Sequence, residues 1–311
     1  MNTLLHTVLG ASGAVGRAVV NDLTHRGLPM RAVSRTTILP GVESKQADLL
    51  NLFQTKDAIQ GSSHVYLCVG LPYSTKVWKQ EFPRIMKNVI VACEEANAVL
   101  IFLDNAYMYG PSPLKTPIDE QHLQQPVAKK GYIRKEVADI LLQAIADQRI
   151  QAVIGRAAEF YGPYAKNSMF YISFLERMLQ GKAPQVLCKP SVQHMYAYTE
   201  DIGRALVALA LDTSTYGSVW HLPVGAPVTI EDMTATFNEV LNTNFSTSFM
   251  PSLVRHGLSP FISPLREVGE MLYQFETDYV FSFDKFQRKF PDFKVTLYKE
   301  GVKKMVDSFQ E

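Results

Sequence analysis

Apolar and polar positions alternate in blocks along the first half of the chain, and the blocks predict strands and helices in turn. Short apolar runs are typical of strands buried on both faces of a sheet. The segments between them carry the apolar spacing of three to four residues that amphipathic helices show. This alternation favours an α/β fold with a doubly wound parallel sheet. The predicted strands are residues 4–9, 30–34, 63–69, 99–103 and 152–156, and the predicted helices are residues 16–26, 82–96 and 131–146.

Beyond residue 163 the regular alternation ends, and aromatic residues, proline and glycine become frequent. Periodicity still predicts helices over residues 169–179 and 202–211, the second with Thr199 as its N-cap, and a strand over residues 219–222. A chain of 311 residues suits one large α/β domain with a smaller second unit.

Composition and charge exclude several classes of partner. Hydrophobic residues make up 47% of the chain and charged residues 20%, which provides enough apolar surface for a sizeable core. The net charge is +1 and the basic residues are scattered, so we expect neither a nucleic acid nor a membrane as partner. No apolar run approaches the roughly 18 residues of a membrane span, and the first residues already form a predicted strand. We therefore expect no signal peptide and no membrane-spanning segment.

The spacing of cysteine and histidine bears on redox state and metals. Cys68, Cys93 and Cys188 are far apart and form no CxxC pair, so we expect reduced thiols in a cytoplasmic protein. The seven histidines form no HxxxH or HxH pair, and we expect no metal site.

The most informative segment is an apolar strand followed directly by three glycines and the start of a helix. Glycine lets the turn fold, lets the backbone approach a pyrophosphate, and lets the helix pack on the strand. The helix N-terminus offers free N–H groups and a partial positive charge to phosphate. We therefore predict a dinucleotide site. Its expected contacts are Gly10, Ser12, Gly13, Ala14, Val15, Gly16 and Arg17 on the loop, with Val69 and Gly70 at the end of another predicted strand.

Five segments, in order along the chain, resemble the extended short-chain dehydrogenase/reductase superfamily in its NAD-dependent epimerase/dehydratase branch. They are the glycine motif, Ala47-Asp48-Leu49, Asn105-Ala106-Tyr107-Met108-Tyr109-Gly110, the stretch from Arg156 to Phe160-Tyr161-Gly162-Pro163, and Tyr198-Thr199-Glu200-Asp201-Ile202.

This resemblance implies a Rossmann-type domain that binds NAD(P) in residues 1–165, completed by about residues 196–222. It implies a smaller C-terminal substrate-binding lobe made of residues 166–195 and 223–311. Ligands are then expected at the carboxyl ends of the strands, between the two parts. The resemblance also implies a possible homodimer that pairs through the helices predicted at 82–96 and 131–146.

The end of the second strand bears on the choice of cofactor. Family members that select NAD usually carry a carboxylate there, whereas this chain has Ser34-Arg35. A guanidinium can bind a 2′-phosphate with a planar, charge-assisted fork, and Arg17 is placed to reach the same phosphate. We expect NADP rather than NAD as the cofactor; the alternative is that both arginines are simply solvated. By resemblance Asp48 faces the adenine amino group, and otherwise it is a turn residue.

The catalytic motif of the family is incomplete in this chain. The family uses a hydroxyl residue and a Tyr-x-x-x-Lys on a helix, whose lysine holds the ribose and assists the tyrosine. Asn105 occupies the hydroxyl position, and an amide polarises a carbonyl but relays no proton. If Lys135 is the motif lysine, Tyr132 lies one residue late, roughly 100° around the helix.

The chain therefore resembles an atypical member of the superfamily. In this interpretation Lys135 binds the ribose, Asn105 polarises the substrate oxygen, and Tyr132 or Tyr107 donates the proton. The alternative for Tyr132 is that it only packs or lies at a dimer face.

Two positions of the substrate lobe argue against a nucleotide sugar. By resemblance, members that bind such substrates have Asn and Arg, which hold the diphosphate, where this chain has Glu159 and His194. A carboxylate beside a diphosphate costs free energy, and a mostly neutral histidine recovers little of it. We expect Glu159 and His194 to meet in the cleft, as a proton-handling pair or as an ordinary structural hydrogen bond. Tyr73 and Tyr273 are further expected substrate contacts, and residues 265–274 are predicted to face the cleft or to be solvated.

These features predict an NADP-dependent oxidoreductase or epimerase-like enzyme acting on a small carbonyl or alcohol. The retained Lys135 and the full-size substrate lobe favour the enzyme. The alternative is a non-catalytic NADP-binding protein that senses redox state or serves as a binding partner, which the displaced Tyr-x-x-x-Lys favours.

Overall fold

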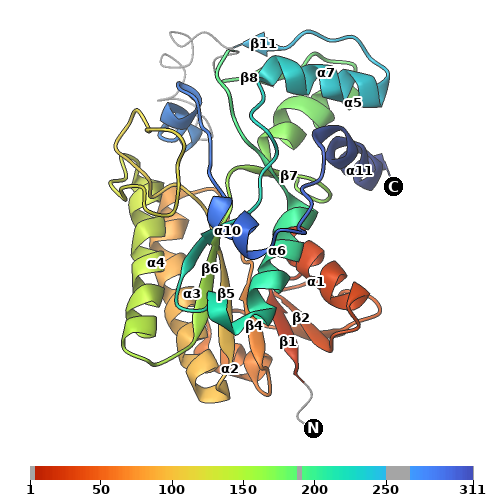
Figure 1. Cartoon of the computed structure of the whole chain (residues 1–311). Coiled ribbons are helices and arrows are strands. Elements are labelled where there is room, and N and C mark those ends of the chain that lie inside the picture. Colours follow the sequence, from red (N-terminus) through yellow and green to blue (C-terminus); the bar gives the residue numbers. More distant parts are fainter. Residues whose placement is uncertain (1–3, 188–190, 250–266, 311) are drawn as a thin grey trace.

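A seven-stranded parallel sheet forms the centre of the molecule (Figure 1). The structure is a computed structural model that describes residues 4–187, 191–249 and 267–310. The spatial order of the strands is β3-β2-β1-β4-β5-β6-β10, and all of the pairs are parallel. Their bounds are β1 His6–Leu9, β2 Met30–Ser34, β3 Glu43–Gln46, β4 His64–Leu67, β5 Val99–Asp104, β6 Ala152–Arg156 and β10 Val219–His221. The prediction of a doubly wound α/β sheet is confirmed.

Helices cover both faces of this sheet. On one face α1 (Ala14–His25) and α6 (Thr199–Leu211) pack together and share a hydrophobic core with alternate residues of the strands. On the other face α2 (Leu52–Ile59), α3 (Thr75–Ala96) and α4 (Lys129–Ala146) share a second core with the remaining strand residues. Successive side chains of a strand point to opposite faces, so continuous apolar strands supply both cores.

The strand order fixes where a ligand can bind. From β1 the chain first builds outward through β2 and β3, then returns to build β4, β5, β6 and β10 on the other side. Connections leaving β1 and β4 therefore diverge, which opens a crevice at the carboxyl ends of these two strands.

A second group of elements lies above the carboxyl ends of the strands (Figure 1). A third hydrophobic core joins residues of chain segments 161–198, 230–237 and 302–306. Its elements include η1 (Phe170–Leu175), α5 (Glu176–Leu179), β8 (Gln185–Val186), α7 (Ile230–Leu241), β11 (Ser248–Phe249) and α11 (Tyr298–Gln310). The connecting elements are β7 (Phe160–Tyr161), β9 (Ala197–Tyr198), η2 (Thr213–Thr215), η3 (Leu272–Phe275) and α10 (Asp284–Lys289).

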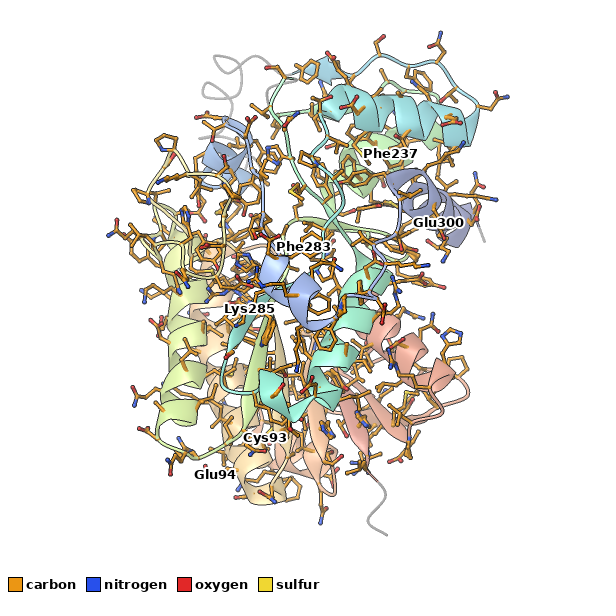
Figure 2. All side chains as sticks on the ribbon, in the orientation of Figure 1. Cys93, Glu94, Phe237, Phe283, Lys285 and Glu300 are labelled. Atoms are coloured by element: carbon orange, nitrogen blue, oxygen red, sulfur yellow. The ribbon has the colours of Figure 1, made fainter. Side chains whose placement is uncertain are left out.

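Helix α10 ties the C-terminal region to the edge of the main sheet. Figure 2 shows Phe283 and Lys285 between the sheet and the upper elements. The Lys285 ammonium lies 4.0 Å from the ring centroid of Trp220 and donates a hydrogen bond to the Val219 carbonyl at 2.7 Å. A cation over an aromatic ring and a charge-assisted hydrogen bond both stabilise this contact.

Several predicted element boundaries differ from the structure, and two of these differences concern α3 and α6. Helix α3 begins at Thr75 rather than at residue 82 and carries Pro83 inside it. The apolar spacing that predicts this helix begins only at Phe82, so the prediction missed the first turns of α3. Thr199 is not the N-cap of α6, because Tyr198 occupies that position and Thr199 is the first helical residue. The Thr199 hydroxyl packs against Gly162, where an added Cβ would lie only 2.2 Å from it.

Two of the three cysteines lie within the described residues. Cys68 and Cys93 are free and buried, and Figure 2 shows Cys93 at the end of the sheet away from the crevice. Cys188 lies outside the described residues. In the parts of the chain that the structure describes, no helix has the length and apolar character needed to cross a membrane. In the same parts, no group of three or more His, Cys, Asp or Glu side chains is arranged to hold a metal ion.

Candidate functional site

The loop between β1 and α1 presents unpaired backbone N–H groups at the crevice. The Gly10 N–H and Ala11 N–H donate to the Val33 carbonyl at 2.9 and 3.0 Å, which holds the loop start against β2. Gly10 has φ +82°, and the Gly13 N–H closes the turn on the Gly10 carbonyl at 3.0 Å. Helix α1 begins directly after Gly13, so its first N–H groups have no acceptor within the helix and are available to phosphate.

Two of the three glycines are required by close backbone contacts. A Cβ on Gly16 would lie 2.2 Å from the Gly10 carbonyl oxygen, and a Cβ on Gly10 would lie 2.9 Å from the Cys68 backbone. A Cβ on Gly13 would meet its nearest atom only at 3.4 Å. The contact between Gly10 and Cys68 places the loop against the end of β4, beside Val69. Loop and strand end thus form a cradle whose shape and free donors fit the pyrophosphate of a dinucleotide.

Arg35 is the free cation at the end of β2. It is exposed and has no ion-pair partner among the residues described. The Ser34 hydroxyl is buried and bonds the backbone of Thr37, so it is already engaged in a local turn. Arg17 lies 4.6 Å from the ring centroid of Tyr164 and donates from Nε to the Ser12 carbonyl at 3.2 Å. Of Arg17, Ser34 and Arg35, Arg35 is therefore the one whose side chain has no hydrogen bond or ring contact to the described residues, while the two terminal nitrogens of Arg17 also remain available.

Asp48 is an exposed turn residue. Its carboxylate accepts the Leu50 N–H at 3.0 Å, and its own N–H donates to the Gln54 side chain at 2.8 Å. These contacts fit the turn alternative for this residue. They leave the second carboxylate oxygen available to another donor.

The predicted register of α4 is wrong. The Tyr132 side chain points away from the crevice and is 61% exposed, and the Lys135 ammonium pairs with Asp139 at 2.7 Å on the helix surface. Both line a groove of about 760 Å³ on the outer face of α3 and α4. Helix α4 buries the adjacent positions Arg134, Val137 and Ala138 instead, and this choice of buried face sets which side chains reach the site. Tyr132 and Lys135 therefore do not join the other candidate residues.

We predict that Tyr132→Phe and Lys135→Ala leave dinucleotide binding unchanged within about twofold, because neither side chain faces the crevice. Calorimetric titration of each variant with NADPH measures this. A loss of affinity of about tenfold or more would contradict this prediction and support the helix register that the sequence predicts.

Lys130 and Arg134 are the pair, four residues apart, that α4 directs inward. Lys130 is fully buried and donates from Nζ to Glu267 Oε2 at 2.5 Å and to Glu270 Oε1 at 2.8 Å. It also contacts Thr75 Oγ1 at 3.1 Å and lies 4.5 Å from the ring centroid of Tyr73. The inward positions thus carry two cations in place of a tyrosine and a lysine. Their i,i+4 spacing was visible in the sequence, but their residue types did not match the motif.

Residues 267–270 close over the ends of two helices. Glu267 accepts the N–H of Thr75, the first residue of α3, and Glu270 accepts the N–H of Lys129, the first residue of α4, both at 2.9 Å. Burial raises the pKa of Glu267, but hydrogen bonds from Lys130 and Thr75 outweigh this and lower it to about 2. The carboxylates of Glu267 and Glu270 are ion-paired with Lys130 rather than solvated, and that this segment faces the cleft stays a prediction. Leu265 and Arg266 lie outside the described residues.

Asp104, the last residue of β5, holds two buried guanidinium groups. Arg134 donates to its Oδ1 at 3.0 Å, and Arg156 donates to its Oδ2 at 3.2 Å. The Tyr109 hydroxyl connects Arg156 to His221, at 3.0 and 2.5 Å. Burial lowers the pKa of His221 to about 3, so the imidazole in this network is neutral. These residues form a buried hydrogen-bond network at the carboxyl end of β5. The sequence did not reveal it because its members come from four separate segments.

Asn105 and Tyr107 follow Asp104, directly after the carboxyl end of β5. Asn105 is half-buried, and its Oδ1 accepts the Tyr107 N–H at 3.2 Å, which fixes the amide orientation. The Tyr107 ring stacks on Trp78 with 6.2 Å between centroids. Burial, and to a smaller extent the nearby Glu159, raise the pKa of Tyr107 to about 12. The phenol is therefore protonated at neutral pH and can donate a hydrogen bond.

Tyrosines gather around Glu159, which follows β6. Tyr73, Tyr107 and Tyr279 all interact electrostatically with its carboxyl, and Tyr273 interacts with Tyr107. Glu159 Oε2 is buried and has no hydrogen-bond partner. Burial raises the pKa of Glu159 to about 8. The predicted substrate contacts Tyr73, Glu159 and Tyr273 therefore belong to one cluster, and Tyr279 is a member that sequence reasoning missed.

The predicted contact between Glu159 and His194 is absent from the described structure. Among the described residues no hydrogen bond joins the two side chains, and His194 Nε2 and Glu159 Oε2 are each buried without a partner. The imidazole instead stacks between aromatic rings, 4.9 Å from Phe275 and 5.6 Å from Tyr279 between centroids. Burial lowers the pKa of His194 to about 4, so it is neutral at pH 7. Neither the proton-handling pair nor the structural hydrogen bond is formed.

Comparison with known proteins bears on this site. The model of the NAD dependent epimerase/dehydratase family matches residues 6–220. Among solved structures, the chain is similar to Bordetella bronchiseptica WbmH in complex with NAD⁺, with 17% identity and a TM-score of 0.78. It is also similar to Bacillus cereus UDP-glucuronic acid 4-epimerase in complex with NAD (15%, 0.80) and Thermus thermophilus UDP-glucose 4-epimerase in complex with NAD (17%, 0.77). Each comparison covers 99% of this chain and 99% of the other. No curated protein sequence matches the chain.

Proposed function

The chain belongs to the NAD dependent epimerase/dehydratase family, and we propose that it is an NADP-dependent oxidoreductase for a small carbonyl or alcohol that is not a nucleotide sugar. Membership of the family implies a nicotinamide dinucleotide as the cofactor class. The observation that carries the proposal is the cradle of Gly10, Gly13 and Gly16 with the unpaired Arg35 beside it. When bound, the dinucleotide supplies or accepts a hydride.

A free cation at the end of β2 supports NADP over NAD. The 2′-phosphate distinguishes the two cofactors, and the free guanidinium of Arg35 can bind it with a charge-assisted fork. Asp48, the nearest predicted carboxylate contact, is held in a turn by Leu50. The similar solved structures named above contain NAD, so the preference for NADP is a departure from them.

The surroundings of Glu159 support a substrate without a diphosphate. In the described part of the chain no cation pairs with Glu159, and its Oε2 has no partner. A diphosphate bound beside it would therefore find no positive charge there to offset its own. The neutral, aromatic surroundings of His194 add no positive charge. This chemistry favours a small neutral carbonyl or alcohol between the tyrosines.

The residues after β5 supply the contacts to the reacting oxygen. Asn105 and Tyr107 lie on the β4–β5 side of the crevice, where the nicotinamide half of a dinucleotide would be expected. The Asn105 amide polarises the oxygen and Tyr107 hydrogen-bonds it. Arg134 and Asp104 hold this edge of the sheet from below.

A non-catalytic NADP-binding protein is the second candidate. The inward positions of α4 carry Lys130 and Arg134, both engaged in ion pairs, so no tyrosine–lysine pair is present on that helix face. A redox sensor requires only the dinucleotide-binding cradle and Arg35. Such a sensor would release a bound protein partner when the cofactor changes redox state.

Turnover distinguishes the two candidates. The purified protein is incubated with NADPH and a panel of neutral aldehydes and ketones, including benzaldehyde, 4-nitrobenzaldehyde and cyclohexanone, and NADPH consumption is followed. Consumption with stoichiometric formation of alcohol supports the oxidoreductase. NADPH binding without turnover of any carbonyl contradicts it and leaves the sensor.

We predict that Arg35→Ala lowers NADPH affinity by roughly 10- to 100-fold and leaves NADH affinity unchanged, because only NADPH carries the 2′-phosphate; the loss corresponds to about 1.4–2.7 kcal/mol. Calorimetric titration with both cofactors measures the ratio, and Arg26→Ala, an exposed arginine paired with Asp22, is the matched control. Equal losses of affinity for NADPH and NADH would show that Arg35 does not bind the 2′-phosphate.

A further inference from the structure

Glu159 is a half-buried residue whose carboxyl oxygen Oε2 is fully buried and left unpaired by the fold. Its Oε2 is buried and accepts no hydrogen bond, and within the described chain no cation pairs with it. Leaving a charged carboxylate in such surroundings is costly, so the group is held in its neutral form at pH 7. A neutral carboxylic acid carries a proton that it can donate.

The strand order places this carboxyl at the reacting end of the crevice. Tyr73 follows β4, Tyr107 follows β5 and Glu159 follows β6, so three adjacent strands bring their following residues to one edge. Those strands lie on the side of the crevice away from β2 and its Arg35. Tyr279 adds a fourth polar group from the C-terminal region.

No other group in this cluster is as well suited to release a proton. Burial raises the pKa of Tyr107 to about 12 and that of Tyr273 to about 12, whereas the Glu159 pKa is raised to about 8. A general acid works best when its pKa lies near the operating pH. Lys130 occupies the inward position of α4, but both Glu267 and Glu270 hold its ammonium group.

We propose that the Glu159 carboxyl, rather than a tyrosine, donates the proton to the substrate oxygen, while Tyr107 hydrogen-bonds that oxygen. This inference rests on the proposed oxidoreductase function.

Each bond that forms in this step replaces a bond that breaks. The carbonyl carbon accepts a hydride, with its two electrons, from the reduced dinucleotide, and the C=O π bond breaks toward oxygen. The oxygen forms an O–H bond with the proton of Glu159, whose O–H bond breaks to leave a carboxylate. Glu159 recovers its proton from solvent, and alcohol oxidation is the same sequence in reverse.

The test compares wild-type protein with Glu159→Gln, using the aldehyde that wild-type protein reduces fastest. We expect kcat to fall by roughly 100-fold or more, with KM and NADPH affinity changed less than about threefold, because glutamine fits the site but transfers no proton. Tyr107→Phe should lose less kcat than Glu159→Gln. Glu136→Gln, at an exposed glutamate on the outer face of α4, is the control and should leave kcat unchanged. If Glu159→Gln keeps kcat within about threefold of wild type, the proposal is overturned.

Two measurements on wild-type protein test the same step without a substitution. The pH dependence of kcat should be flat near neutral pH and fall above about pH 8 as Glu159 loses its proton. Infrared difference spectra of the protein without substrate should show a carboxylic-acid carbonyl band that disappears over the same pH range. A rate that does not fall above pH 8, or a protein with no such band at pH 7, overturns the proposal.

Failure of this inference is distinguishable from failure of the proposed function. If wild-type protein binds NADPH and reduces no carbonyl, the oxidoreductase function and this step fail together. If wild-type protein is active and Glu159→Gln is equally active, the function stands and Glu159 is not the acid.

Discussion

Gly16→Ala is expected to abolish dinucleotide binding, with an affinity loss of roughly 100-fold or more, and to lower the free energy of unfolding by about 3 kcal/mol. The new Cβ would lie 2.2 Å from the Gly10 carbonyl oxygen and 2.8 Å from Ala11 Cα. Both atoms belong to backbone, so α1 must move away from the loop. Calorimetric titration with NADPH and urea denaturation measure the two effects.

Gly13→Ala is the matched control for the steric part of this prediction. Its Cβ would meet the Gly10 carbonyl only at 3.4 Å, and its φ of −74° suits any residue. We expect its free energy of unfolding to stay within about 1 kcal/mol of wild type. If Gly16→Ala is as stable as Gly13→Ala and binds NADPH normally, the loop is not the tight cradle described above.

Asp104→Asn is expected to lower the free energy of unfolding by about 3–5 kcal/mol. Asp104 is 1% exposed and neutralises Arg134 and Arg156, which are 5% and 0% exposed. The asparagine has nearly the same shape, so the loss comes from two buried cations left without an anion. Urea denaturation monitored by circular dichroism measures it.

Asp139→Asn is the control for this second prediction. Its carboxylate pairs with Lys135 on the outer face of α4, where both side chains are accessible to water. Exposed pairs of this kind contribute at most about 1 kcal/mol. Equal stability losses at positions 104 and 139 would contradict the assignment of Asp104 as the anion of the buried network.

Six of the seven strands could be predicted from the sequence because local pattern determines them, whereas the polar strand β3 was not predicted. The apolar runs at residues 30–34 and 152–156 match β2 and β6 in both bounds, and the glycine motif lies between β1 and α1 as predicted. Buried parallel strands leave little choice of pairing once each is flanked by helices. Helix starts were less predictable, since Thr75 begins α3 through a cap from Glu267, almost two hundred residues away.

The cofactor cradle was predictable for the same reason, whereas the far side of the site was not. Whether α4 directs Lys130 or Tyr132 inward depends on anions that lie elsewhere in the chain, Glu267 and Glu270. A motif read along one helix cannot show these partners. The predicted encounter of Glu159 with His194 was wrong because aromatic rings, and not the carboxyl, surround the imidazole.

The most direct measurement is a calorimetric titration of the wild-type protein with NADPH, NADP⁺, NADH and NAD⁺ in parallel. An NADP-binding protein with the cradle and Arg35 described above should bind the two phosphorylated forms at least about tenfold, or 1.4 kcal/mol, more tightly than their counterparts. Equal or tighter binding of NADH and NAD⁺, or binding of none of the four, would contradict an NADP site at the β1–α1 loop.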